Sequence, residues 1–332
     1  MLTMSNVVAR MLSLLTIPLL TSLLTPNAYG AAAMVVTLVG LLSCIALAGM
    51  DVSYMRSYQE ATRYEPVRVE RFVWRFVLGT MLAIALVAWF AWPYVSRYLA
   101  LPDYLVYFVV LGIAANLAHT MVVVRARISQ RYRLISIATL ISAASTAAAS
   151  ISIACFWRQD EFALVLAVLV TWLVPILMLR GPGVRALRTK SGLSREQRLA
   201  VLSVGYAALL TAPAYWVMSS SDRWFLAAYA GIESVGVYSV CYSVAILGML
   251  LNNAVLPIWT TEAVREVEAQ GLAGQAELGR VADQILAALL VVWLAVAAAG
   301  GDIVRILAAP QFHSAVGIVP FIGLAVMFHG VS

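Results

Sequence analysis

The feature that most constrains this chain is a series of ten long, mostly apolar runs. Each run has about the 20 residues that a helix needs to cross a bilayer. They occupy residues 6–25, 31–50, 74–92, 104–124, 134–156, 162–179, 200–225, 234–257, 283–304 and 315–332. Lipid-exposed backbone must satisfy its own hydrogen bonds, and the strands of a barrel would alternate apolar and polar residues. The sequence therefore predicts an all-α, polytopic transmembrane protein.

Composition supports this class, because only 11% of the residues are charged and the mean hydropathy is +0.91. A soluble domain has roughly 25% charged residues, so this chain has too few to cover itself with a polar surface. The net charge of +6 lies in loops between the apolar runs. No basic stripe is interleaved with aromatic residues, and this argues against nucleic acid as a partner.

The basic residues predict the orientation of the chain in the membrane. Alternate loops hold 17 of the 22 lysines and arginines, whereas the loops of the opposite set hold only Arg97, Arg158 and Arg305. This asymmetry predicts a cytoplasmic N-terminus. In the first long loop, Gln59–Arg75 mixes glutamates with arginines at helical spacing, which predicts a charged interfacial helix.

Two pairs of matching segments indicate an internal repeat. Gly30 and Gly236 are 206 positions apart, and each lies at the start of an apolar run after a short turn. LALPDY at 99–104 matches LAAPQF at 307–312 with an offset of 208. A unit of about 207 residues would hold six helices, so the two units would be related by an axis along the membrane normal. We expect an N-terminal lobe at 1–198 and an incomplete C-terminal lobe of four helices at 199–332, as in a fragment of a longer protein.

Charged residues inside apolar runs are the candidate functional residues, because charges at membrane depth are costly. Arg10 lies within the first run, on one helical face with Asn6 and Ser13, and Thr21 lies further along. Its alternative role is that the side chain extends to the membrane interface. Asp222 and Arg223 lie within the seventh run, shortly before a turn at Gly231–Gly236.

Asp222 and Arg223 are neighbours in sequence, and neighbours on a helix do not face each other. Each is therefore expected to need a partner on another helix, or water. The alternative role for both is structural, as a pair that locks two helices. Arg56, close to the end of the second run, is more typical of an interfacial residue.

Several kinds of site have no counterpart in the sequence. It has no P-loop and no Ser-His-Asp arrangement, and its outer loops are short. Its three cysteines have no CxxC spacing, and its histidines lack the spacing of metal ligands. We therefore expect no catalytic residues, no metal and no cofactor, and we do not expect an enzyme.

Three segments resemble the polysaccharide flippases of the Wzx type, in the multidrug/oligosaccharidyl-lipid/polysaccharide exporter superfamily. They are Arg10 followed by IPLLTSLLTPNAYG, the segment SSSDRWFLAAYAGIESVGVYSVCYSVA, and DIVRILAAPQFHSAVGIVPFIGLAVMFHG. The resemblance implies two six-helix lobes around a central cavity in the bacterial cytoplasmic membrane. It also implies alternating access for a polyprenyl-pyrophosphate-linked oligosaccharide, used in O-antigen, capsule or exopolysaccharide synthesis.

On this resemblance, Arg10, Arg56 and Arg223 are the positions that could bind the pyrophosphate, and Asp222 is the candidate for ion coupling. The expected partners are the lipid-linked oligosaccharide, membrane lipids and other proteins of surface-glycan assembly. One alternative is a multidrug cation antiporter of the same superfamily, although such proteins often have an acid in the first helix, where this chain has Arg10. Another is a membrane glycan polymerase, ligase or glycosyltransferase, and the last is a non-transporting scaffold.

Overall fold

Every element in the described part of the chain is a helix, as the apolar runs predict. The computed structural model describes residues 2–59, 65–179, 193–209, 211–249, 259 and 275–329. The elements are α1 (Leu2–Leu23), α2 (Pro26–Leu47), α3 (Met50–Gln59), α4 (Pro66–Leu99), α5 (Leu105–Ile128), α6 (Tyr132–Phe156), α7 (Glu161–Met178), α9 (Arg195–Leu209), α10 (Thr211–Ala245), η1 (Ile246–Gly248), α12 (Gln275–Leu307), η3 (Pro310–Ile318) and α13 (Val319–His329).

Nine helices within these ranges are long and apolar enough to span a membrane. Each of the ten predicted runs overlaps one of them. Run 200–225 is divided between the end of α9 and the start of α10, and run 234–257 also falls on α10. The ends of the runs 234–257 and 315–332 lie outside the described residues. The predicted class, an all-α multi-pass membrane protein, is confirmed.

The element α10 is a hairpin of two arms, because its backbone leaves the helical conformation at Gly231 (φ 82°, ψ 169°). The hydroxyl of Tyr238 donates a hydrogen bond to Asp222, sixteen positions earlier. In a straight helix these residues would be about 24 Å apart, at 1.5 Å per residue. The first arm, 211–230, and the second arm, 232–245, therefore lie side by side. The turn predicted at Gly231–Gly236 lies at Gly231, and residues 232–236 already belong to the second arm.

The predicted interfacial helix at Gln59–Arg75 is not a separate element. Residues 60–64 lie outside the described ranges, and α4 runs without interruption from Pro66 to Leu99. Proline in the first turn is compatible with a helix start. Val69, Val73 and Val77, spaced four apart, are buried along one face. This apolar stripe continues across residue 74, where the span was predicted to begin. Burial of one continuous face stabilises a single helix over both parts.

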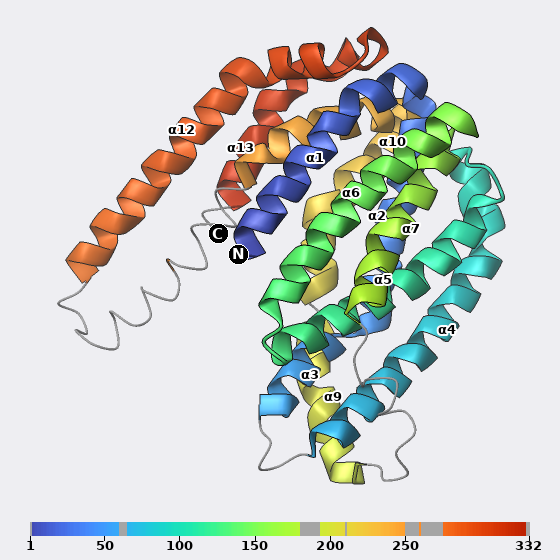
Figure 1. Cartoon of the computed structure of the whole chain (residues 1–332), viewed down its shortest axis with the longest axis vertical. Coiled ribbons are helices and arrows are strands. Elements are labelled where there is room, and N and C mark those ends of the chain that lie inside the picture. Colours follow the sequence, from blue (N-terminus) through green and yellow to red (C-terminus); the bar gives the residue numbers. More distant parts are fainter. Residues whose placement is uncertain are drawn as a thin grey trace.

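The two largest of four buried apolar clusters among the described residues join most of the helices. The larger draws residues from α2, α3, α4 and α5, and it includes Val201 of α9 and Val235 of the second arm. The other joins Ile17 of α1 to the second arm, α12, η3 and α13. In Figure 1, α12 and α13 lie on one side of α1, and helices α2 to α7 lie on the other. The boundary at 198/199 stays a prediction, since the larger cluster contains residues from both sides of it.

The two glycines that the repeat pairs are in contact with each other. A Cβ atom on Gly236 would lie 2.9 Å from the backbone nitrogen of Gly30 and would overlap the carbonyl oxygen of Pro26. A Cβ atom on Gly30 would overlap the carbonyl oxygen of Ile232. With an offset of 206 positions, Pro26 corresponds to Ile232, so the two contacts are equivalent. Such reciprocity is what a two-fold relation between similar units requires.

Candidate functional site

A polar cluster lies between the two arms of α10. Asp222 on the first arm accepts a hydrogen bond through Oδ2 from the hydroxyl of Tyr238 on the second arm. The Asp222 side chain is partly exposed, at 36%. A carboxylate in a spanning helix needs such partners, because an unpaired charge there is costly.

Arg223 is held more tightly, with only 12% of its side chain exposed. Its Nη1 lies 3.6 Å from Oδ1 of Asp222 and 3.5 Å from the carbonyl oxygen of Ser219. Its guanidinium carbon lies 4.4 Å from the ring centroid of Tyr242 and 5.7 Å from that of Tyr238. These are cation–π distances, so the guanidinium charge is partnered within the hairpin.

The sequence predicted that Asp222 and Arg223 each need a partner on another helix, or water. Tyr238 on the second arm is such a partner for Asp222, but the sequence did not predict the contact between Asp222 and Arg223. Their Cβ atoms do point apart, as neighbours on a helix do. The long Arg223 side chain nevertheless folds back towards the preceding turn at Ser219 and reaches the carboxylate. The two tyrosines were not identified from the sequence, although their i, i+4 spacing places them on one face of the second arm.

Replacing Tyr238 with phenylalanine should destabilise the hairpin, because Asp222 loses a hydrogen-bond donor while the aromatic ring stays over Arg223. We expect a loss of roughly 1–3 kcal/mol in unfolding free energy, the cost of leaving a charged acceptor unpaired. Thermal unfolding of the purified protein measures it. Tyr94→Phe is the matched control, since Tyr94 is 77% exposed. Equal melting temperatures for Tyr238→Phe and wild type would contradict a stabilising role for this bond.

Arg10 lies on α1, outside the Asp222–Arg223 cluster, and it is exposed together with Asn6 and Ser13. The polar face predicted to continue to Thr21 ends before that residue. Thr21 is fully buried, and its Oγ1 accepts a hydrogen bond of 3.0 Å from the backbone nitrogen of Ala309. Thr21 therefore joins α1 to the start of η3 rather than lining an open surface.

The predicted repeat would give Arg10 a counterpart in the second unit. With an offset of 206 positions, Arg10 corresponds to Trp216 on the first arm. The Trp216 indole donates a hydrogen bond of 3.1 Å to the carbonyl oxygen of Thr37, so the first arm is fastened to α2. Within the described part of the chain, the Arg10 side chain has no hydrogen bond and no ion pair. Trp216 thus has a hydrogen-bond partner on another helix, whereas the side chain at the corresponding position, Arg10, has none among the described residues.

Arg56 is also exposed, in the last turn of α3. Ser53 on the same helix donates a hydrogen bond of 2.5 Å to the carbonyl oxygen of Val201, and this bond fixes α3 against α9. The structure therefore does not bring the three predicted arginines into one cluster. It places Arg10 and Arg56 on exposed surfaces of different helices and Arg223 inside the hairpin.

A buried ion pair that sequence reasoning missed joins α4 to α5. Arg125 pairs with Glu70, and their side chains are 20% and 5% exposed. The sequence placed both among solvated loop charges. The sequence feature that could have revealed this pair is the position of Glu70 next to Val69 and Val73, because these valines lie on the buried face of α4.

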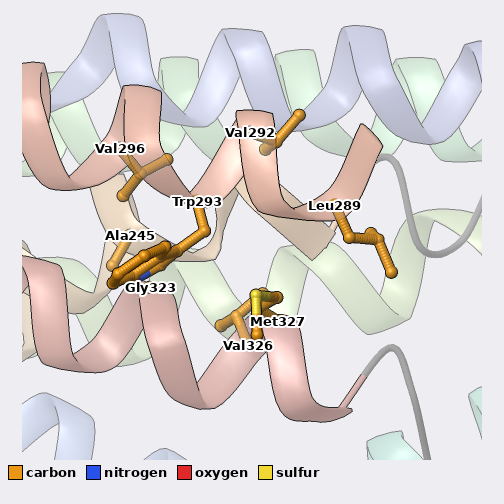
Figure 2. A pocket seen from close by; sticks show the side chains of 8 residues that line it. All are labelled: Ala245, Leu289, Val292, Trp293, Val296, Gly323, Val326 and Met327. Carbon is orange, nitrogen blue, oxygen red and sulfur yellow. The ribbon is translucent and has the colours of Figure 1, made fainter. Parts of the chain in front are cut away.

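The pocket in Figure 2 lies between the end of the second arm, α12 and α13, and it is apolar. The one polar side-chain atom among its lining residues, Nε1 of Trp293, donates a hydrogen bond of 3.1 Å to the carbonyl oxygen of Pro320. The pocket therefore offers no group that would bind an anion. Among the described residues, no three of the His, Cys, Asp and Glu side chains are grouped as a metal site would need.

Comparison with known proteins defines the class first. The fold is similar to a solved structure described as the inward-facing conformation of a multidrug resistance MATE family transporter of the MOP superfamily. The TM-score is 0.56 and the sequence identity is 14%, over 98% of this chain and 84% of that chain. The similarity shows the fold, which is that of a multi-pass helical membrane protein.

The family follows from the sequence match. The chain belongs to the polysaccharide biosynthesis protein family, whose model matches residues 1–261. The family predicted from the sequence segments is thereby confirmed. No curated protein matches the chain.

Proposed function

We propose that the chain is a flippase that moves a polyprenyl-pyrophosphate-linked oligosaccharide across the bacterial cytoplasmic membrane for surface polysaccharide synthesis. Membership of the polysaccharide biosynthesis protein family is the observation that carries this proposal. The similarity to a transporter fold, rather than to an enzyme, supports transport as the activity. Membrane lipids and other proteins of surface-glycan assembly are the partners that this role implies.

The proposed substrate carries its negative charge on the pyrophosphate, and arginine binds phosphate oxygens in a bidentate manner. Arg10 and Arg56 are exposed in this conformation. We assign the first contact with the pyrophosphate to Arg10, because it lies on a spanning helix and its side chain has no polar partner among the described residues. Arg56, on a short helix at the end of α2, would act earlier, as the headgroup approaches.

Alternating access would proceed from a state closed at one end of the molecule. The end of α1 is tied to η3, since Nε2 of Gln311 donates hydrogen bonds to the carbonyl oxygens of Thr21 at 2.9 Å and Leu24 at 3.1 Å. Tyr29 and Phe312 pack edge to face beside these bonds. Arg10 lies towards the opposite end of α1, which the basic loops assign to the cytoplasm. The tied end would then be the outer gate, and Arg10 would be reached from inside.

Asp222 would couple transport to an ion. Protonation of the carboxylate would remove the charge that lies 3.6 Å from Arg223. The guanidinium would then be held only by the Ser219 carbonyl and the tyrosine rings, and it could pair with a phosphate instead. This exchange would give Arg223 its role in pyrophosphate binding at a later stage of transport than Arg10.

The deciding experiment is translocation of a fluorescent lipid-linked oligosaccharide in proteoliposomes that contain the purified full chain. Accessibility of the sugar to a non-permeant quencher reports its transfer between leaflets. Transfer above that of empty liposomes supports the flippase, and no transfer under any ion gradient argues against it.

A multidrug cation antiporter is the second candidate, because the similar solved structure is described as a multidrug resistance transporter. Arg10 in the first span argues against it, since a cationic substrate would be repelled there. Proton-driven uptake of an organic cation in the same proteoliposomes, without oligosaccharide transfer, would favour the antiporter. A glycan polymerase or glycosyltransferase would instead lengthen the glycan, and product size distinguishes that outcome.

Gln311→Leu should weaken the gate at the end of α1, because it removes both hydrogen bonds to α1 while keeping a similar volume. We expect roughly 1–3 kcal/mol less stabilisation of the closed gate, hence a larger open population. Distances between spin labels placed across the gate measure this population. Ser22→Ala is the control, since among the described residues the Ser22 hydroxyl donates a hydrogen bond only within α1, to the carbonyl oxygen of Leu19. An unchanged distance distribution in Gln311→Leu would show that these bonds do not hold the gate.

A further inference from the structure

We propose that the connection between α5 and α6 binds the phosphate headgroup of an anionic phospholipid. Three arginines lie within seven positions there, namely Arg127, Arg131 and Arg133, and all three are exposed. None of their guanidinium groups has a hydrogen bond or ion pair within the described part of the chain. Three exposed positive charges this close together repel one another, and an anion would relieve the repulsion.

The backbone brings these side chains together from two helices. The amide of Gln130 donates to the carbonyl oxygen of Arg127, and the amide of Arg131 donates to that of Ala126, each at 2.9 Å. Gln130 adopts a positive φ of 53°, which makes the reversal tight. An open pocket is lined by residues 130–134 at the start of α6. The positive end of the α6 dipole adds to the favourable potential for an anion at this position.

No acidic side chain in the described part of the chain pairs with these three arginines. The sequence has no Asp or Glu between Asp103 and Asp160. The neighbouring carboxylate across the helix interface, that of Glu70, is buried and paired with Arg125. Arg125 thus points into the helix interface, whereas the next three arginines do not. An anion from outside the chain would supply the compensating negative charge that the described residues do not.

The height of the cluster in the membrane identifies that charge as a lipid phosphate. The connection lies between the spans Leu105–Ile128 and Tyr132–Phe156, so its arginines are at the level of the headgroups. Tyr132 is 46% exposed between two of them, and tyrosine prefers this interfacial layer. Arginine pairs with phosphate oxygens in bidentate geometry. The proposal does not rest on the flippase function, because the site uses none of Arg10, Arg56, Asp222 or Arg223; only its leaflet depends on the proposed orientation.

The test measures lipid binding to the purified full chain by native mass spectrometry, with phosphatidylglycerol and phosphatidylcholine in competition. R131Q/R133Q should lower the preference for phosphatidylglycerol by roughly 30-fold, because each arginine near an anionic surface contributes about 1 kcal/mol and 1.4 kcal/mol is tenfold. The control is R75Q/R195Q, which removes the same charge from two exposed arginines on α4 and α9. Its preference should stay at the wild-type value.

Three results would overturn the proposal. One is an unchanged preference in R131Q/R133Q, and another is an equal loss in the control, which would indicate a general effect of charge. The third is displacement of phosphatidylglycerol by inorganic phosphate at the same concentration, which would indicate an anion site that does not need a membrane. If R131Q/R133Q does not purify as a monodisperse protein, R127Q replaces it, with an expected loss of roughly fivefold. An R127Q preference equal to that of wild type would then refute the site.

Discussion

Arg10→Ala should reduce the initial rate of lipid-linked oligosaccharide translocation by roughly 10- to 100-fold. A hydrogen bond to a charged group contributes about 1.5–3 kcal/mol, and Arg10 would make such bonds only when the pyrophosphate is bound. The free protein should lose little, because the side chain is exposed and makes no polar contact with any described residue. We therefore expect normal abundance in the membrane and a wild-type melting temperature alongside the loss of transport.

Two further variants sharpen the Arg10 experiment. Arg10→Lys keeps the charge but loses the bidentate geometry, so it should recover only part of the rate. Arg97→Ala removes an exposed arginine from the last turn of α4, at the opposite side of the predicted orientation, and should transport normally. A wild-type rate in Arg10→Ala would exclude Arg10 from the mechanism without bearing on the fold.

Gly236→Ala should be strongly destabilising, because the new methyl group would overlap the carbonyl oxygen of Pro26. Backbone cannot move aside as a flexible side chain can, so the second arm and α2 would have to separate. Overpacking costs about 1–3 kcal/mol, occasionally more, and a backbone clash belongs at the upper end. A fall in melting temperature and in the yield of monodisperse protein would show this effect.

The reciprocal contact makes the glycine experiment more specific. Gly30→Ala should have a similar effect, because its methyl group would overlap the carbonyl oxygen of Ile232. Gly79→Ala is the matched control, since a Cβ atom there would meet none of the described residues within 4 Å, and alanine favours helix by up to about 1 kcal/mol. If Gly236→Ala and Gly79→Ala melted at the same temperature, the close approach of α2 to the second arm would be refuted.

Most of the fold followed from local features of the sequence. The spans could be found because a helix crossing lipid must be apolar over about 20 residues whatever its neighbours are. The turn at Gly231 followed from a glycine after a polar step. The repeat predicted from the offset between Gly30 and Gly236 stays a prediction, and the reciprocal contact of these glycines is consistent with it. The prediction of a separate interfacial helix was wrong, because it weighed only the charges at Glu65–Arg75. The buried valines between these charges continue into the span and make one helix of both parts.

The candidate site was only half predictable. The sequence identified Asp222, Arg223 and Arg10 because charged residues in apolar runs are conspicuous. It did not identify Tyr238 and Tyr242, because tyrosine is common in such runs and only their position opposite Arg223 gives them a role. Nor did it reveal that Arg223 is already partnered while the Arg10 side chain has no polar partner in the described part of the chain.

The sequence by itself thus determined the class of protein, the spans, the hairpin turn and the family. Each of these depends on residues close together in the chain or on similarity along it. Only the tertiary structure decided which charges have partners and that Thr21 joins α1 to η3 by a hydrogen bond. It also decided that Trp216 bonds to α2, whereas Arg10 makes no polar contact with any described residue. These outcomes depend on how helices pack over more than a hundred positions of separation. Lipid-facing helices are alike in composition, so their pairing is set by side-chain shape and by a few polar contacts rather than by hydrophobicity.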